Sequence, residues 1–255
     1  MVPENTGEKV PILRLLSEVL VVAVAFIFFA LVISVLFFFV MEGGADISAF
    51  QDDPEVREAM DVATLFAAPL VIFATLVVGD VLLRKRHVSL RSLGFKRPES
   101  IGVTIFEGLG LTAILLALWV AIWQYYETMN LGVPYKFMFV LQGNDFIFFY
   151  AMTAVAWVAA AFGEEVLFRG LLLNNFKEMF RGSKAGIAFA VIFQAMIYSF
   201  LHVGETMVQS VPVFLTGIIL GVAYFLFNRN LWPLIIAHGI LNNIYFTLVY
   251  TNTIG

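Results

Sequence analysis

The chain has 255 residues, of which 61% are hydrophobic and only 13% are charged. A soluble domain is about half apolar and about a quarter charged, so this composition excludes an ordinary soluble enzyme. The 15 basic residues are outnumbered by 19 acidic ones, which argues against a nucleic-acid binder. The lack of cysteine removes disulfides, thiolate metal sites and cysteine nucleophiles. A mean hydropathy of +0.91, concentrated in long uncharged runs, indicates a protein that crosses the membrane several times.

The apolar runs predict an all-α fold, a polytopic transmembrane bundle of seven helices. Crossing roughly 30 Å of hydrocarbon takes about 20 residues of α-helix. A shorter run at 137–144 allows an eighth, short or re-entrant element. The predicted spans are 19–41, 62–79, 108–126, 146–163, 185–201, 211–228 and 231–250.

Charged residues between the spans predict the orientation. The loop 84–97 contains no acid, whereas the preceding connection, 42–61, is strongly acidic. Because loops rich in Lys and Arg stay in the cytoplasm, the N-terminus is expected inside and the C-terminus outside. We expect a multi-pass protein of the cytoplasmic (plasma) membrane if the cell is prokaryotic. The basic residues of the loop are Arg84, Lys85, Arg86, Arg91, Lys96 and Arg97.

Three ionisable residues interrupt an otherwise apolar stretch at Glu164, Glu165 and Arg169. An ionisable side chain in the bilayer is costly, which makes each of these a functional candidate. Glu165 and Arg169 are four residues apart and can pair on one helix face, whereas Glu164 points elsewhere and is free to exchange protons. The alternative is a buried ion-pair network that only fixes the register of the helix.

Two further pairs have the same four-residue spacing on later helices. His238 and Asn242 share a face of the last span, where they could stabilise an oxyanion together. Tyr198 precedes His202 at the end of the fifth span. The alternatives are an interhelical hydrogen bonder for His238 and a helix-end histidine at the water interface for His202.

Other patterns favour structural roles. Gly217 and Gly221 form a G-x-x-x-G motif, which is typical of close helix packing. Trp119, Trp123 and the tyrosines at 125 and 126 are predicted to form an aromatic belt at the membrane interface. Residue counting also predicts a mismatch in depth: on straight helices His202 lies roughly 27 Å from the cytoplasmic face and Glu164 roughly 18 Å.

The order Glu-Glu-x-x-x-Arg, aromatic-x-x-x-His and His-x-x-x-Asn on successive helices resembles the CPBP family of intramembrane proteases. This family includes the CAAX prenyl endopeptidases and the bacteriocin self-immunity proteins. The resemblance covers roughly 146–250 and divides the chain into an N-terminal region of three spans, 1–145, and a catalytic core of four spans, 146–250. The second motif of the family usually begins with Phe, where this chain has Tyr198.

The resemblance implies a metal-free glutamate protease that cleaves peptide bonds within or near the membrane. Glu164 is then the base that activates water, assisted by His202. His238 and Asn242 stabilise the oxyanion. The implied support of the site consists of Glu165, Arg169 and Tyr198.

Two other hypotheses remain open from the residues alone. Glu164, His202 and His238 are an acceptable set of zinc ligands, although the chain has no His-Glu-x-x-His helix. The same buried charges could instead form the proton relay of a transporter, or belong to a bacteriocin-immunity factor. The expected partners are membrane lipid and a peptide or lipid-modified protein substrate, with no nucleic acid and no cofactor other than the zinc alternative.

Overall fold

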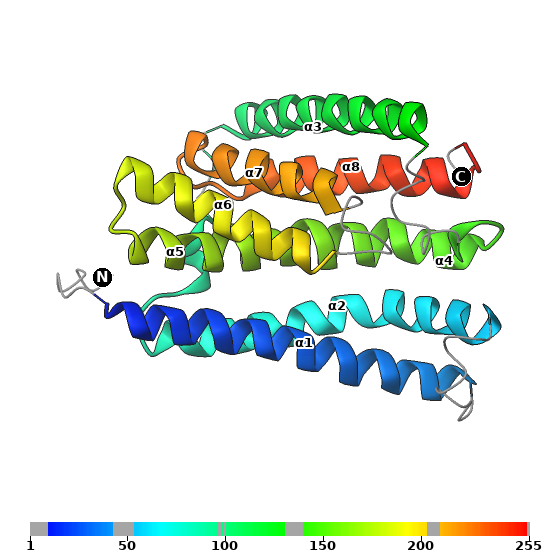
Figure 1. Cartoon of the computed structure of the whole chain (residues 1–255), viewed down its shortest axis with the longest axis horizontal. Helices are drawn as coiled ribbons and strands as arrows, with labels where there is room; N and C mark the ends of the chain where they lie inside the picture. The colour runs from blue at the N-terminus through cyan, green and yellow to red at the C-terminus, as the bar shows by residue number, and fades with distance from the viewer. Residues whose placement is uncertain are drawn as a thin grey trace.

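The computed structural model describes residues 10–42, 54–95, 98, 100–130, 140–202 and 210–253. Within these ranges all regular structure is helical, which confirms the all-α part of the predicted fold class (Figure 1). The elements are α1 (Ile12–Glu42), α2 (Pro54–Arg84), η2 (Leu90–Leu93), α3 (Ile101–Met129), α4 (Asp145–Tyr150), η4 (Ala151–Leu172), α5 (Leu173–Met179), α6 (Lys184–Phe200), α7 (Val211–Leu226) and α8 (Trp232–Tyr250).

The segments α4, η4 and α5 form one uninterrupted helix of 35 residues, Asp145–Met179. Its central part, η4, is a π-helix, and the backbone angles at its junctions, Tyr150 and Leu173, are those of an α-helix. Sequence analysis expected this span to end at Gly163. The helix instead carries Glu164, Glu165 and Arg169 in its interior, so rigid backbone positions all three side chains.

Five helices are long and apolar enough to cross a membrane, which supports an integral membrane protein. The other two, α6 and α7, have 17 and 16 residues and fall short of the roughly 20 that a full crossing needs. The described part of the chain therefore has five full-length candidate spans rather than seven. The five are Ile12–Val40, Glu58–Arg84, Ile101–Met129, Asp145–Met179 and Trp232–Tyr250.

The predicted eighth element at 137–144 falls partly outside the described residues, since 131–139 are not among them. The part that is described, 140–144, is a turn. Leu141 in this turn is fully buried, and Asn144 ends it by capping α4. Leu141 is therefore apolar because its side chain packs in a buried cluster of the bundle.

Side-chain caps and prolines set where the helices begin. Ser100, Asn144 and Ser183 each accept a hydrogen bond from a backbone N–H in the first turn of α3, α4 and α6. Such caps satisfy donors that have no partner inside the helix. Pro212 and Pro233 occupy the first turns of α7 and α8, where their fixed backbone angle suits a helix start.

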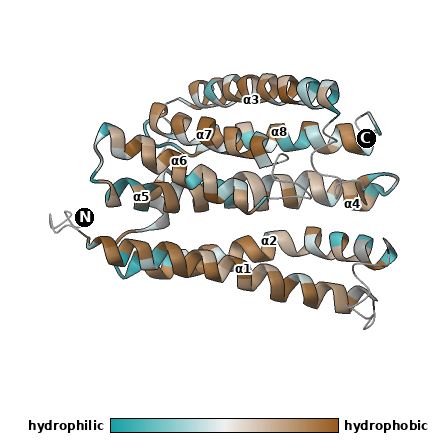
Figure 2. Cartoon of the chain, viewed as in Figure 1, coloured by the Kyte–Doolittle hydropathy of each residue, from teal (hydrophilic) through white to brown (hydrophobic). Residues whose placement is uncertain are grey.

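The helices run side by side along the long axis of the molecule (Figure 1). α1 packs on α2, α2 packs on η4, and α8 lies between η4 and α3, while α6 is in contact with α5 and α7. The outer face of α1 is almost entirely hydrophobic (Figure 2), with Leu13 80% and Val40 81% exposed. Side chains this apolar and this exposed are suited to contact with lipid tails.

The G-x-x-x-G motif of α7 packs against α6, as its spacing predicts. A Cβ on Gly217 would lie 3.0 Å from the Cβ of Ala195, and one on Gly221 would lie 3.1 Å from the Gln194 amide. The amide nitrogen of Gln194 also donates to the Gly217 carbonyl oxygen at 2.8 Å. Hydrogen bonding and close approach together hold the two short helices to each other.

Candidate active site

A cavity of about 780 Å³ lies between α2, α3, η4, α6, α7 and α8. Its walls are mostly apolar, but it also collects most of the polar residues that the sequence singled out. Glu165 and Arg169 do not line it and are fully buried behind it. The predicted site residues that line the cavity are Glu164, Tyr198, His202, His238 and Asn242.

Glu164 faces His202 across the wall of the cavity. Their Oε1 and Nε2 atoms are 3.7 Å apart, and the side chains are 16% and 29% exposed. The other ring nitrogen of His202, Nδ1, lies 2.7 Å from the carbonyl oxygen of Tyr198, which fixes the ring orientation. At 3.7 Å the two atoms are within ion-pair distance but beyond a direct hydrogen bond, so a water molecule on the cavity side can contact both groups. Within the described residues Glu164 Oε2 has no hydrogen-bond partner.

The depth mismatch that residue counting predicts between Glu164 and His202 does not occur. The helix carrying Glu164 continues to Met179, which places Glu164 further from that end of the bundle than residue counting assumed. In addition, α6 is inclined to its neighbours (Figure 1), so His202 lies less deep than a straight helix would place it. The two side chains therefore meet at one level.

Glu165 binds two partners with one carboxylate oxygen. Its Oε1 accepts a hydrogen bond from Arg169 Nη1 at 2.9 Å, so the predicted pair is present, and lies 2.8 Å from His238 Nδ1. Glu165 and Arg169 are both fully buried, and His238 is 4% exposed. This connection holds the imidazole of α8 against η4. It leaves Nε2 as the ring nitrogen of His238 that is available to the cavity.

His238 and Asn242 lie one turn apart on α8, and both line the cavity. The spacing predicted this shared face. The arrangement offers an imidazole nitrogen and a side-chain amide to the same space that Glu164 and His202 reach. A base, a candidate water position and two candidate donors are thus gathered around one apolar cavity.

Comparison with protein families matches residues 145–244 to type II CAAX prenyl endopeptidase Rce1-like proteins. This region is therefore similar to the CAAX proteases. The recognition based on three short motifs is thereby confirmed, and the family implies peptidase activity. Comparison with curated proteins and with solved structures returned no significant match.

The CAAX protease region does not enclose the cavity alone. It spans α4 to most of α8 and supplies Glu164, His202, His238 and Asn242. The facing wall comes from α2 and α3, which precede the matched region and contribute Asp61, Leu65 and Trp119, among others. The N-terminal helices thus help to shape the candidate site.

Tyr198 stands where the CAAX protease motif usually has Phe, and its aromatic ring makes the contacts. The Arg169 guanidinium carbon is 4.7 Å from the ring centroid, and the His202 ring is 4.6 Å away on the same helix. Phe168 meets the Tyr198 ring edge-on at 4.9 Å. The ring therefore links the buried arginine to the histidine that faces Glu164.

Sequence reasoning missed the role of Trp119, which it placed in an interfacial belt. The indole instead lines the cavity and donates a hydrogen bond from Nε1 to Thr216 Oγ1 on α7 at 3.1 Å. Tyr245 on α8 lies beside it, with ring centroids 6.3 Å apart. The hydroxyl of Thr216, within an otherwise apolar helix, was the one sign in the sequence that this residue has a polar partner. No spacing in the sequence links Thr216 to Trp119.

The zinc hypothesis requires Glu164, His202 and His238 to converge on one ion. In the part of the chain that the structure describes, no group of three His, Asp or Glu side chains is placed to hold a metal. His238 directs its Nδ1 at Glu165 rather than toward Glu164.

Proposed function

We propose that the chain is a glutamate-type intramembrane endopeptidase that hydrolyses peptide bonds of membrane-associated or lipid-modified substrates. The observation that carries the proposal is the spacing of Glu164 and His202, 3.7 Å apart at the wall of an apolar cavity that His238 and Asn242 also line. The match of residues 145–244 to CAAX prenyl endopeptidases supports the same reaction class.

Glu164 and His202 activate the nucleophile in this mechanism. A water molecule on the cavity side, bound by Glu164 Oε1 and His202 Nε2, attacks the carbonyl carbon of the scissile bond. Its proton passes to the Glu164 carboxylate as the new C–O bond forms. A positioned general base of this kind contributes typically 10²–10⁴-fold to the rate, about 3–5 kcal/mol of the barrier.

His238 and Asn242 stabilise the negative charge that develops on the carbonyl oxygen. The Asn242 amide is a neutral donor. When His238 donates to Glu165 from Nδ1, its Nε2 carries a proton only in the imidazolium form. Fixed donors in a water-poor site are more effective than water because they need no reorganisation during the reaction. The C–N bond then breaks, and Glu164 returns its proton to the leaving amine.

The cavity also suits the substrate class. Apolar side chains from four helices line the space beside Glu164, so an apolar segment or a lipid chain next to the scissile bond is accommodated without burying unpaired polar groups. The matched family is described as CAAX prenyl endopeptidases, and prenylated peptides are one substrate class that this lining fits. Representative apolar lining residues are Leu65, Leu116, Val120, Val213, Leu241 and Ile244.

The test compares the peptides released by cells that express the wild-type chain, Glu164→Gln or Glu107→Gln. Glu107 is a half-buried glutamate on α3 that does not line the cavity, so it is a matched control for the same substitution. We expect fragments that appear with the wild type and Glu107→Gln and disappear with Glu164→Gln. A synthetic peptide spanning the cleavage site then gives turnover in proteoliposomes.

Two outcomes would contradict the proposal. Release of the same fragments by Glu164→Gln would remove Glu164 from the mechanism. A wild-type chain that changes no peptide, while driving a proton-coupled flux that Glu164→Gln abolishes in liposomes, would support the transporter hypothesis instead.

A further inference from the structure

The two ends of the bundle carry opposite charge. We call the end where α2 finishes and α6 begins the basic end, and the end where α2 and α4 begin the acidic end; they lie at opposite sides of Figure 1. Basic residues outnumber acidic ones at the basic end, which carries Arg84, Lys85, Arg86, Arg181, Lys184 and Arg229 beside Glu18, Asp80 and Glu178. The acidic end carries Glu55, Glu58, Asp61, Glu127 and Asp145.

The cavity extends from Glu164 toward the acidic end. Asp61 near the start of α2, Glu127 in the last turn of α3 and Leu248 near the end of α8 all line it. Gln124 and Glu127 are also exposed to the outside, so the cavity has a mouth at this level. The short helices α6 and α7 meet the cavity only near one end of each, with Tyr198, His202, Val213 and Thr216. Beyond that point α2, α3 and α8 form its walls.

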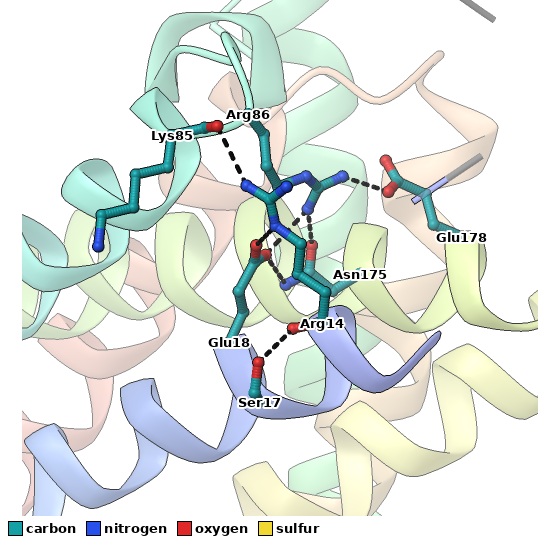
Figure 3. A network of polar contacts seen from close by, with 7 residues as sticks. All are labelled: Arg14, Ser17, Glu18, Lys85, Arg86, Asn175 and Glu178. Carbon is teal, nitrogen blue, oxygen red and sulfur yellow. Dashed lines mark hydrogen bonds and ion pairs between the residues drawn. The ribbon is translucent and has the colours of Figure 1, made fainter. Parts of the chain in front are cut away.

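The basic end, by contrast, is closed by a polar network that joins three helices (Figure 3). The Arg86 guanidinium donates to Glu18 Oε2 on α1 at 3.0 Å and to Asn175 Oδ1 on α5 at 2.9 Å, and it also pairs with Glu178. The side chains of Arg86 and Glu18 are each only 6% exposed. Arg14 covers the network by donating to the Lys85 carbonyl oxygen at 3.0 Å.

Packed side chains fill the space between this network and Glu164. Tyr224 on α7 donates to the Leu93 carbonyl oxygen, and Asn174 donates to the Tyr224 hydroxyl at 2.8 Å, so a second polar link crosses the bundle. Among the described residues that line the cavity there is no lysine or arginine. Buried apolar residues complete the filling, namely Leu93, Leu171, Leu172, Phe176, Leu231 and Leu234.

We propose that substrate reaches Glu164 only from the acidic end, and that this end faces away from the cytoplasm. Basic residues remain on the cytoplasmic side of membrane proteins, which places Arg84 to Arg86 inside and the mouth at Gln124 outside. The substrate is then an extracytoplasmic segment of a membrane-anchored peptide. This inference rests on the proposed peptidase function for its substrate, whereas the position of the mouth can be measured without any activity.

The natural lack of cysteine makes single-cysteine variants clean probes of sidedness. Gln124→Cys places a thiol at the mouth, and Lys85→Cys places one at the basic end, where the Lys85 side chain is exposed and points away from the polar network (Figure 3). Intact cells are treated with a membrane-impermeant maleimide. We expect Gln124→Cys to be labelled from outside and Lys85→Cys only after permeabilisation. The reverse pattern would overturn the inference.

The same variants test the route to the site. We expect a bulky maleimide on Gln124→Cys to remove most of the turnover of the unmodified variant, and the same label on Lys85→Cys to leave turnover unchanged. Loss of turnover on labelling Lys85→Cys, or full turnover after labelling Gln124→Cys, would place the route at the other end. In either case, turnover that survives Glu164→Gln would contradict the proposed mechanism and not the position of the mouth.

Discussion

His238 Nδ1 lies 2.8 Å from Glu165 Oε1, although Glu164 is the glutamate that lines the same cavity as His238. The two neighbouring carboxylates thus have histidine partners on different helices. Glu165 binds His238 of α8 from a fully buried position, and Glu164 faces His202 at the cavity wall. This division predicts different consequences for the same substitution at adjacent positions.

Glu165→Gln is expected to destabilise the fold, and Glu164→Gln to remove turnover. Arg169 is fully buried and pairs with Glu165, so neutralising Glu165 leaves an uncompensated buried charge that costs roughly 3–5 kcal/mol. Glu164→Gln keeps the size of the side chain and removes the base, with an expected loss of about 10²–10⁴ in kcat. Melting temperature and kcat are measured for both. A large drop in melting temperature for Glu164→Gln alone would reverse the assignment.

Asn242→Ala is expected to lower kcat by about 10²–10³, the loss seen when one oxyanion donor is removed. KM should change little, because the donor acts mainly on the charged transition state. The matched control is Asn243→Ala, which alters the neighbouring residue of α8 that does not line the cavity. An equal loss of kcat in both variants would indicate a general disturbance of the helix.

Tyr198→Phe is expected to retain most of the activity, and Tyr198→Ala to lose it. The ring, with Arg169 at 4.7 Å and His202 at 4.6 Å, survives in the first variant and is removed in the second. A cation–π contact of this kind contributes about 0.5–2 kcal/mol. The measurement is kcat for each of the two variants. A severe kcat defect in Tyr198→Phe would show that the hydroxyl is required.

Arg86→Ala is expected to lower the melting temperature, since it removes the buried cation beside Glu18 and leaves that carboxylate only the half-exposed Arg14 at 3.4 Å, at a cost of roughly 1–3 kcal/mol. The control is Arg84→Ala, whose side chain is 76% exposed and pairs with Asp80. A surface pair of that kind contributes about 0–1 kcal/mol. Thermal unfolding in detergent compares the two, and equal shifts would contradict a structural role for the buried network.

Gly163→Ala is expected to destabilise the chain by about 1–3 kcal/mol through overpacking. A Cβ at Gly163 would lie 2.0 Å from Ile72 Cγ2 on α2, so the helices must separate beside Glu164. The double variant Gly163→Ala with Ile72→Ala makes room for the added methyl group. Its unfolding should be closer to wild type than the sum of the two single changes, and strict additivity would argue against the contact.

Local spacing predicted the parts of the site that lie on one helix. The Glu165–Arg169 pair and the shared face of His238 and Asn242 follow from a four-residue interval, and the structure contains both. The partners from distant segments did not follow, because no periodicity relates Glu165 to His238 or Trp119 to Thr216. Those contacts depend on which helices are neighbours in the bundle.

The presence of long apolar helices was also predictable from local sequence, whereas the length of each helix was not. Long uncharged runs identified α1, α2, α3 and α8. The predicted fourth span ended at Gly163, because charges were taken to end an apolar run, whereas in the structure the helix buries Glu165 and Arg169 against each other and continues to Met179. The hydrogen-bonded pair allows the helix to continue through charged residues.

The shortness of α6 and α7 has a consequence for the lipid around them. At about 1.5 Å per residue, 16 or 17 residues extend roughly 24–26 Å, less than the roughly 30 Å of a typical hydrocarbon layer. Hydrophobic mismatch of this size makes the adjacent leaflets compress, at a fraction of a kcal/mol for each ångström. We expect the bilayer to be thinnest beside the end of α6 that precedes His202, where headgroups and water come closest to the candidate site.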